Sequence, residues 1–219
     1  MRLLVVSDLH GDLAAARRAC DRVEPDVILS CGDWGDPEEV EEPSLAALLA
    51  SAPIYTTFGN HDPMEMLGRS HNRDGSPVLL PQGEARVVAG LNVAAIGGIW
   101  AKSHKKPHYV TDDDVSSFAD RIARSGPVDI LLTHGCPVGL ADLTPSGRHG
   151  GQRCLLEANK TIVPRLHLCG HLHVAQERTL KDGRRIINVG ATPEGSVVVI
   201  ESDPGLAALE ARLEKWDTA

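Results

Sequence analysis

Residues 3–10 read LLVVSDLH, so that four apolar residues run directly into a polar turn that carries Asp8 and His10. A short apolar run without alternation is typical of a strand that is buried on both faces. The next segment, residues 13–23, places small and apolar residues at helical spacing. A buried strand followed by a helix predicts an α/β fold in which helices connect the strands.

The pattern of an apolar run that ends in polar residues returns along the chain. Further runs lie at 26–29, 54–58, 128–132, 166–168, 185–189 and 197–200. Residues 86–96 predict a hairpin that turns at Ala89-Gly90, and Thr111 with Asp114 predicts the capping box of a helix that ends at Gly126. Residues 1–219 are therefore predicted to form a single α/β domain with a mixed sheet system.

The end of the chain carries a stripe of apolar residues, formed by Leu206, Leu209, Leu213 and Trp216. This spacing predicts a C-terminal amphipathic helix at about 206–216. Core packing is the first interpretation of the stripe, and a contact in a homo-oligomer is the second.

The composition argues against several classes of protein. A formal net charge of −8 at pH 7 does not favour an extended groove for nucleic acid. Three Trp, two Tyr and two Phe are too few for a platform that stacks many bases. The opening apolar run is too short for a signal peptide or a membrane span, and five cysteines without a CxxC pair indicate reduced thiols. We therefore expect a cytoplasmic protein without a membrane partner.

Side chains that can bind metal ions follow strand after strand. They are Asp8, His10, Asp33, Asn60, His61, His134, His171 and His173. Because ligands bind at the carboxyl ends of the strands in open α/β sheets, we expect these residues to share one rim. Imidazole, carboxylate and amide ligands suit Mn, Fe, Zn or Ni better than Ca or a thiolate-bound structural zinc. Seven of these eight side chains, taken as ligands, predict two ions about 3.5–4 Å apart that share a bridging carboxylate.

The residues stand in five blocks: Asp8-Leu9-His10, Gly32-Asp33, Gly59-Asn60-His61-Asp62, Thr133-His134 and Gly170-His171-Leu172-His173. Their order and spacing resemble the signature of the calcineurin-like metallophosphoesterases over nearly the whole chain. The resemblance implies that family's fold, in which two mixed β-sheets pack face to face and are flanked by helices as a four-layer α-β-β-α sandwich. It also implies a phosphohydrolase with two divalent ions, Mn in the first place, that act through a bridging hydroxide.

The resemblance further implies a role for each residue of the five blocks. Asp8, His10 and His173 would hold the first ion, Asp33 would bridge, and Asn60, His134 and His171 would hold the second. His61 would be a non-ligand acid near the leaving group, oriented by Asp62.

Two other segments are predicted to border the site. Residues 100–109 form the one basic segment flanked by aromatic residues, and His104, Lys105 and Lys106 in it are candidates for binding the substrate. Arg148 and His149 resemble a loop that borders the site in small phosphodiesterase-like members of the family. A solvated loop without function is an equally good interpretation of each segment.

Departures from the family pattern bear on the substrate. Phosphoprotein phosphatases of the superfamily carry an arginine after the second motif and another after the third, whereas Trp34-Gly35-Asp36-Pro37 and Asp62-Pro63-Met64-Glu65 stand here. The short chain also leaves no room for the capping domain with which nuclease members grip DNA. We therefore predict a metal-dependent phosphodiesterase for a small phosphoester, a nucleotide among the candidates. The alternatives are a phosphomonoesterase and a non-catalytic metal-binding interaction module of the same fold.

Overall fold

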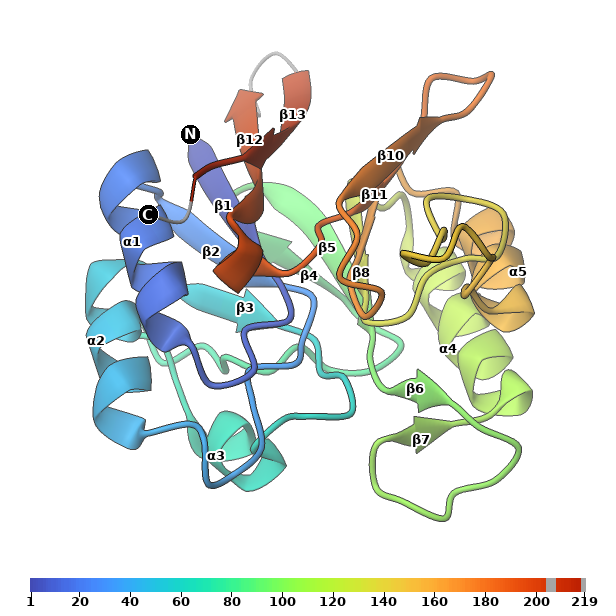
Figure 1. Cartoon of the computed structure of the whole chain (residues 1–219). Coiled ribbons are helices and arrows are strands. Elements are labelled where there is room, and N and C mark those ends of the chain that lie inside the picture. Colours follow the sequence, from blue (N-terminus) through green and yellow to red (C-terminus); the bar gives the residue numbers. More distant parts are fainter. Residues whose placement is uncertain (204–207, 218–219) are drawn as a thin grey trace.

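Two large mixed β-sheets form the centre of the computed structural model, which describes residues 1–203 and 208–217 (Figure 1). The first sheet has the order β13-β12-β1-β2-β3 and contains β1 (Arg2–Val6), β2 (Val27–Ser30), β3 (Ile54–Thr56), β12 (Ser196–Asp203) and β13 (Ala208–Lys215). The second has the order β10-β11-β9-β8-β5-β4 and contains β4 (Ala85–Val88), β5 (Leu91–Ile96), β8 (Ile130–Thr133), β9 (Leu166–Cys169), β10 (Gln176–Thr179) and β11 (Arg185–Asn188). A short parallel pair, β6 (Ile99–Trp100) with β7 (Tyr109–Val110), lies apart from both sheets.

Helices cover the outer face of each sheet. The helices α1 (Leu13–Val23) and α2 (Glu42–Ser51) lie against the first sheet, and α4 (Asp112–Ser125) and α5 (Arg153–Ile162) lie against the second (Figure 1). Two short elements complete the fold, α3 (Met64–Arg69) and the 3₁₀ turn η1 (Thr192–Glu194). The predicted four-layer sandwich is confirmed.

Strand β1 explains why the opening run has no polar alternation. Leu4 and Val6 pack in the core between the first sheet and its helices, whereas Leu3 and Val5 pack in the core between the two sheets. Both faces of β1 are thus buried, as is typical of central strands in such layered folds. The helix predicted after it spans Leu13–Val23, and the Asp12 carboxylate accepts a hydrogen bond from the Ala15 amide as its N-cap.

The predicted C-terminal helix is wrong, because residues 208–215 form the edge strand β13, antiparallel to β12. Leu209 and Leu213 are four residues apart, a spacing that places them on one face of a strand as well as of a helix. Ala211, which stands between them, is also buried in the core between the sheets. Every second residue thus faces this core, as is typical of a strand. Leu206 lies outside the described residues.

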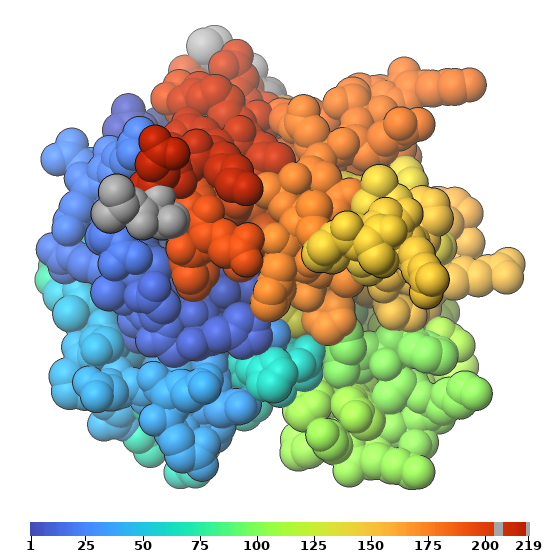
Figure 2. Space-filling view, in the orientation of Figure 1, coloured from blue at the N-terminus to red at the C-terminus, as the bar shows by residue number. Residues whose placement is uncertain are grey.

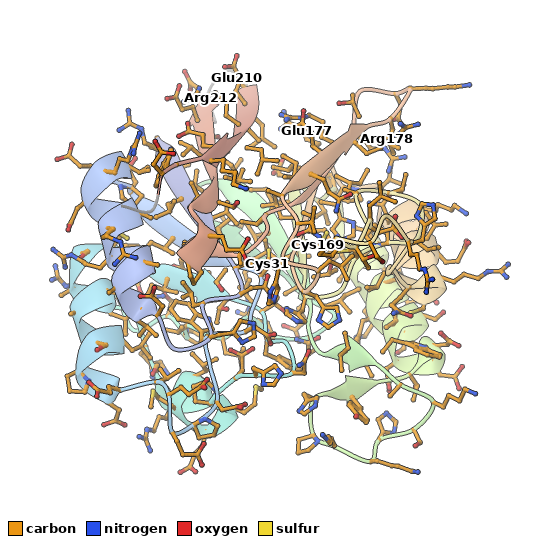
Figure 3. The ribbon with its side chains drawn as sticks, viewed as in Figure 1. Cys31, Cys169, Glu177, Arg178, Glu210 and Arg212 are labelled. Atoms are coloured by element: carbon orange, nitrogen blue, oxygen red, sulfur yellow. The ribbon has the colours of Figure 1, made fainter. Side chains whose placement is uncertain are left out.

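Two edge strands carry charged side chains. Figure 3 shows Glu177 and Arg178 on β10, and Glu210 and Arg212 on β13. Charges on an edge strand oppose pairing with the edge of another molecule. No helix within residues 1–203 and 208–217 has the length and apolar composition that spanning a membrane requires.

Candidate metal centre

The five predicted blocks meet at the carboxyl ends of strands from both sheets. Asp8 follows β1, Asp33 follows β2, and Asn60 and His61 follow β3 in the first sheet. His134 follows β8, and His171 and His173 follow β9 in the second sheet. Cys31 and Cys169, which precede two of the blocks, lie near each other in the middle of the sandwich (Figure 3). The predicted common rim is thus formed by both sheets together.

Asp8, His10 and His173 form one group whose potential ligand atoms lie within 4.8 Å of one another. The Nε2 atoms of His10 and His173 are 3.1 Å apart, and Nε2 of His173 is 3.5 Å from Oδ1 of Asp8. The hydrogen bond with Asp8 raises the pKa of His173 above its ordinary value. Two imidazole nitrogens and a carboxylate that face one point form a set of ligands suited to a divalent ion.

Asp33, His134 and His171 form a second group with the same spread of ligand atoms. Oδ2 of Asp33 lies 3.3 Å from Nε2 of His134 and 3.8 Å from Nε2 of His10, which belongs to the first group. Burial lowers the pKa of His171 to about 4, which keeps its imidazole neutral at pH 7. The Asp33 carboxylate therefore lies between the two groups.

Two buried polar atoms at this rim lack a hydrogen-bond partner among the described residues: Nε2 of His134 and Oδ1 of Asn60. Nδ1 of His134 donates to the Cys31 carbonyl over 3.0 Å, so Nε2, which faces Asp33, is the ring nitrogen that can take a proton or a metal ion. Leaving buried acceptors unpaired costs free energy, and a cation bound by both atoms would remove that cost. The residues present thus fit a metal ion at the second group.

A proton on Nε2 of His134 competes with a metal ion at the second group. Burial lowers the pKa of the His134 imidazole, but the adjacent Asp33 carboxylate outweighs burial and the pKa is raised to about 9. Burial likewise raises the pKa of Asp33, and His134 outweighs it, so that the Asp33 pKa lies well below its ordinary value. Metal binding at the second group must displace this proton.

Close packing around the groups depends on two glycines of the blocks. A Cβ atom on Gly59 would lie 2.2 Å from Oδ1 of Asp33, and one on Gly170 would lie 2.5 Å from Oδ2 of Asp8. Both distances are far below van der Waals contact, so a side chain at either position would displace a candidate ligand. This requirement explains why glycine stands beside the histidines in the third and fifth blocks.

The backbone at the rim is strained. Nine non-glycine residues in the described part of the chain have a positive φ, and five of them are candidate ligands: Asp8, His10, Asp33, His171 and His173. The left-handed conformation costs an L-residue about 1 kcal/mol or more. Strain of this kind is concentrated at functional sites, where the surrounding structure holds it.

His61 pairs with Asp36 and not, as predicted, with Asp62. Nδ1 of His61 lies 3.0 Å from Oδ1 of Asp36. The Asp62 carboxylate instead accepts hydrogen bonds from the amides of Asp33, Trp34 and Gly59, and burial raises its pKa to about 7. Asp62 thus joins the second and third blocks. The sequence did not predict Asp36 as the partner of His61, because the two residues are 25 positions apart. The feature that could have indicated it is its place three residues after Asp33, in the turn that carries a candidate ligand.

His104 attaches the basic segment to α4, because its Nε2 lies 2.6 Å from Oδ2 of Asp114 in the first turn of that helix. Lys105 is exposed, and the Lys106 ammonium lies over the Tyr109 ring, 5.8 Å from its centroid. His108 in this segment is half-buried, and the charges of His61, Asp33 and Asp36 act on its imidazole. His108 was not among the predicted site residues.

Arg148 and His149 lie on a small hairpin, in which the Thr144 amide donates to the Arg148 carbonyl and the Gly150 amide to the Asp142 carbonyl. Nδ1 of the exposed His149 lies 2.7 Å from Oδ1 of the buried Asp142. Gly150 is in contact with Leu172, which stands between His171 and His173. The hairpin therefore borders the loop that carries these two histidines.

The sequence and the fold were compared with known proteins. A sequence model of the family described as calcineurin-like phosphoesterase matches residues 1–175. The chain is 24% identical over 236 residues to a lariat debranching enzyme of Caenorhabditis briggsae, an alignment that covers 79% of this chain and 46% of the relative. It is 33% identical over 81 residues to human metallophosphoesterase domain-containing protein 1, covering 34% and 25% of the two chains.

In structure, the chain resembles the protein TT1561 of Thermus thermophilus with a TM-score of 0.71 and 16% identity, over 96% of this chain and 97% of the other. The chain spans less than half the length of the lariat debranching enzyme that it matches. The match to the family model covers most of the chain and includes all five blocks. The chain belongs to the calcineurin-like phosphoesterase family.

Proposed function

We propose that this protein is a phosphodiesterase that uses two divalent ions, with Mn preferred and Fe, Zn or Ni as alternatives. Asp8, His10 and His173 would hold one ion, Asn60, His134 and His171 the other, and Asp33 would bridge them. Bound ions would offset the charge of the phosphate and lower the pKa of a bound water. The observation that carries the proposal is the place of Asp33 between two ligand groups, beside the buried Nε2 of His134 and Oδ1 of Asn60.

The protein's own residues supply the rest of the chemistry. Hydrolysis breaks the bond between phosphorus and the leaving oxygen, and the oxygen of water enters the product phosphate. The departing alkoxide needs a proton, which His61 would give from Nε2 while Asp36 holds Nδ1. Asn60 contributes a neutral oxygen, so the centre keeps a net positive charge for an anionic substrate.

A diester is preferred over a monoester because the positions after the second and third motifs carry no arginine to hold a dianionic phosphate. The relative named for lariat debranching supports a nucleotide-derived substrate. Turnover of an activated aryl phosphodiester and of the matching monoester, each with Mn, tests the proposal. Faster hydrolysis of the diester supports it, faster hydrolysis of the monoester supports a phosphomonoesterase, and no turnover of either supports the non-catalytic module.

The metal content of variants tests the bridging role separately from activity. We expect about two ions per chain in the fully loaded protein, about one in His134→Ala, and fewer than one in Asp33→Asn, because a shared carboxylate serves both ions. Elemental analysis after dialysis measures this, and His71→Ala, an exposed histidine elsewhere, is the control. At most one ion per chain in the loaded wild-type protein would contradict the two-ion centre.

Replacing Lys105 and Lys106 by Ala should raise KM for a dinucleotide diester severalfold and leave kcat on a small aryl diester nearly unchanged. The reason is that the basic segment can attract the remote part of a larger anionic substrate, whereas the reacting bond lies at the metal groups. Steady-state kinetics on both substrates measure the split. Unchanged KM on every nucleotide diester would make the segment a solvated loop.

A further inference from the structure

Two aromatic rings of the basic segment pack against each other. Residues 102–107 are exposed, whereas His108 and Tyr109 are half-buried. The rings of His108 and Tyr109 meet edge to face, with centroids 5.0 Å apart and an interplanar angle of 84°. The chain has only seven Trp, Tyr and Phe residues, and two of them, Trp100 and Tyr109, lie in this short segment.

The backbone ties this pair to the block that carries Asn60 and His61. The His108 carbonyl accepts a hydrogen bond from the Ile99 amide over 2.9 Å. Gly98, the preceding residue, donates to the Phe58 carbonyl, and a Cβ atom on Gly98 would lie only 2.6 Å from the His108 oxygen. His108 is thus held against the strand end that leads to Gly59-Asn60-His61.

The electrostatics agree with this placement. Burial lowers the pKa of His108, the charges of Lys106 and His61 lower it further, and the charges of Asp33 and Asp36 raise it. The charges that act on His108 thus include those of the His61–Asp36 pair and of Asp33. The segment around residues 100–115 (green) projects beside the N-terminal half (blue to cyan), with a notch between them (Figure 2).

The segment that carries the pair is also held in place before any ligand binds. Nε1 of Trp100 donates to Asp112 over 2.8 Å, and His104 is bound to Asp114, so the start of α4 holds the segment in two places. The Lys106 ammonium lies on the Tyr109 ring. A wall that is fixed before binding loses little entropy when a planar group packs against it.

We propose that the His108 ring, supported edge to face by Tyr109, forms a leaving-group subsite on which a nucleobase stacks, so that the substrate is a phosphodiester whose departing alcohol is a nucleoside. The inference rests on the proposed function, because His61 marks the side from which the alcohol leaves. Stacking on an aromatic wall tolerates all four bases, since every base has a π-face. The subsite therefore favours substrates that carry a nucleobase but does not discriminate among the four bases.

The test compares two diesters under Mn: a dinucleoside monophosphate, whose departing alcohol carries a base, and dimethyl phosphate, a methyl ester with no base on either side. His108→Ala should lower kcat/KM on the dinucleotide about 5- to 100-fold, the usual effect of losing one stacking contact, mainly through KM. It should change kcat/KM on the methyl ester less than twofold. His108→Phe, which keeps a ring, should retain the preference for the dinucleotide, and His108→Gln, which keeps only hydrogen bonds, should not.

Equal losses on both substrates, or a fully active His108→Gln variant, would overturn the stacking subsite. His71→Ala serves as the control, because this exposed histidine lies outside the rim. Equilibrium binding of a non-cleavable methylenephosphonate dinucleotide gives a second readout that needs no turnover. Weaker binding in His108→Ala supports the subsite even if no diester is hydrolysed, an outcome that would overturn the proposed function alone. Unchanged binding would overturn the subsite.

Discussion

Replacing His61 by Ala should slow the hydrolysis of a ribose or alkyl phosphodiester by about 10²–10⁴-fold, the usual contribution of a positioned general acid. An alkoxide is a poor leaving group and needs a proton as it departs, whereas a nitrophenolate leaves without one. The loss on a nitrophenyl diester should therefore be much smaller. Rates on both substrates, with Mn, measure the difference.

The partner of His61 offers a graded second variant. Asp36→Asn keeps the shape of the side chain but removes the carboxylate that holds Nδ1 at 3.0 Å, so it should reproduce part of the loss on the alkyl ester. The metal content of both variants should remain that of the wild-type protein. A loss of metal, or equal losses on both leaving groups, would show that His61 binds a metal ion or positions the substrate instead.

Lowering the pH from 7.5 to 4.5 should cost the folded protein about 3 kcal/mol through His167 alone. His167 is fully buried: Asn159 donates to its Nδ1 over 2.9 Å, and its Nε2 donates to the Thr133 hydroxyl over 2.8 Å, which in turn donates to the Gly135 carbonyl. This chain of hydrogen bonds requires a neutral imidazole, and burial lowers the pKa from 6.5 to about 3. The unfolded chain thus takes up a proton that the folded chain refuses, so stability is complete above pH 6.5 and falls as the pH drops toward 3.

Urea unfolding of the metal-free protein at both pH values measures the effect. His167→Gln has no proton to take up and should lose about 3 kcal/mol less than the wild-type protein over this interval. His71→Gln, at an exposed histidine, should follow the wild-type curve. Parallel losses in the wild-type protein and in His167→Gln, or an imidazole C2–H resonance of His167 that shifts with pH above 4.5 in the folded protein, would contradict the assignment.

The α/β fold and the common rim of the candidate metal ligands could be predicted from local patterns, whereas the four layers and the division of these ligands into two groups were implied by the family resemblance. Buried strands such as β1 need an unbroken apolar run, and their polar ends all lie at one rim once the strands are aligned. The C-terminal strand was mistaken for a helix because Leu209 and Leu213 fit both periods, and the choice depends on the packing of Ala211. The partner of His61 was missed for a related reason, since sequence adjacency favoured Asp62, whereas the turn after β2 brings Asp36 to it.

The left-handed backbone at the candidate ligands has a consequence for selection. His10 and His173 have φ of 43° and 56° and exposed side chains, so glycine at these positions would relieve strain and remove little packing. A chain that served only as a stable scaffold would gain stability from such replacements. The histidines at these positions keep the apoprotein less stable than its own fold allows. Laboratory evolution for heat resistance alone, without selection for turnover, would be expected to erode the centre first at these two positions.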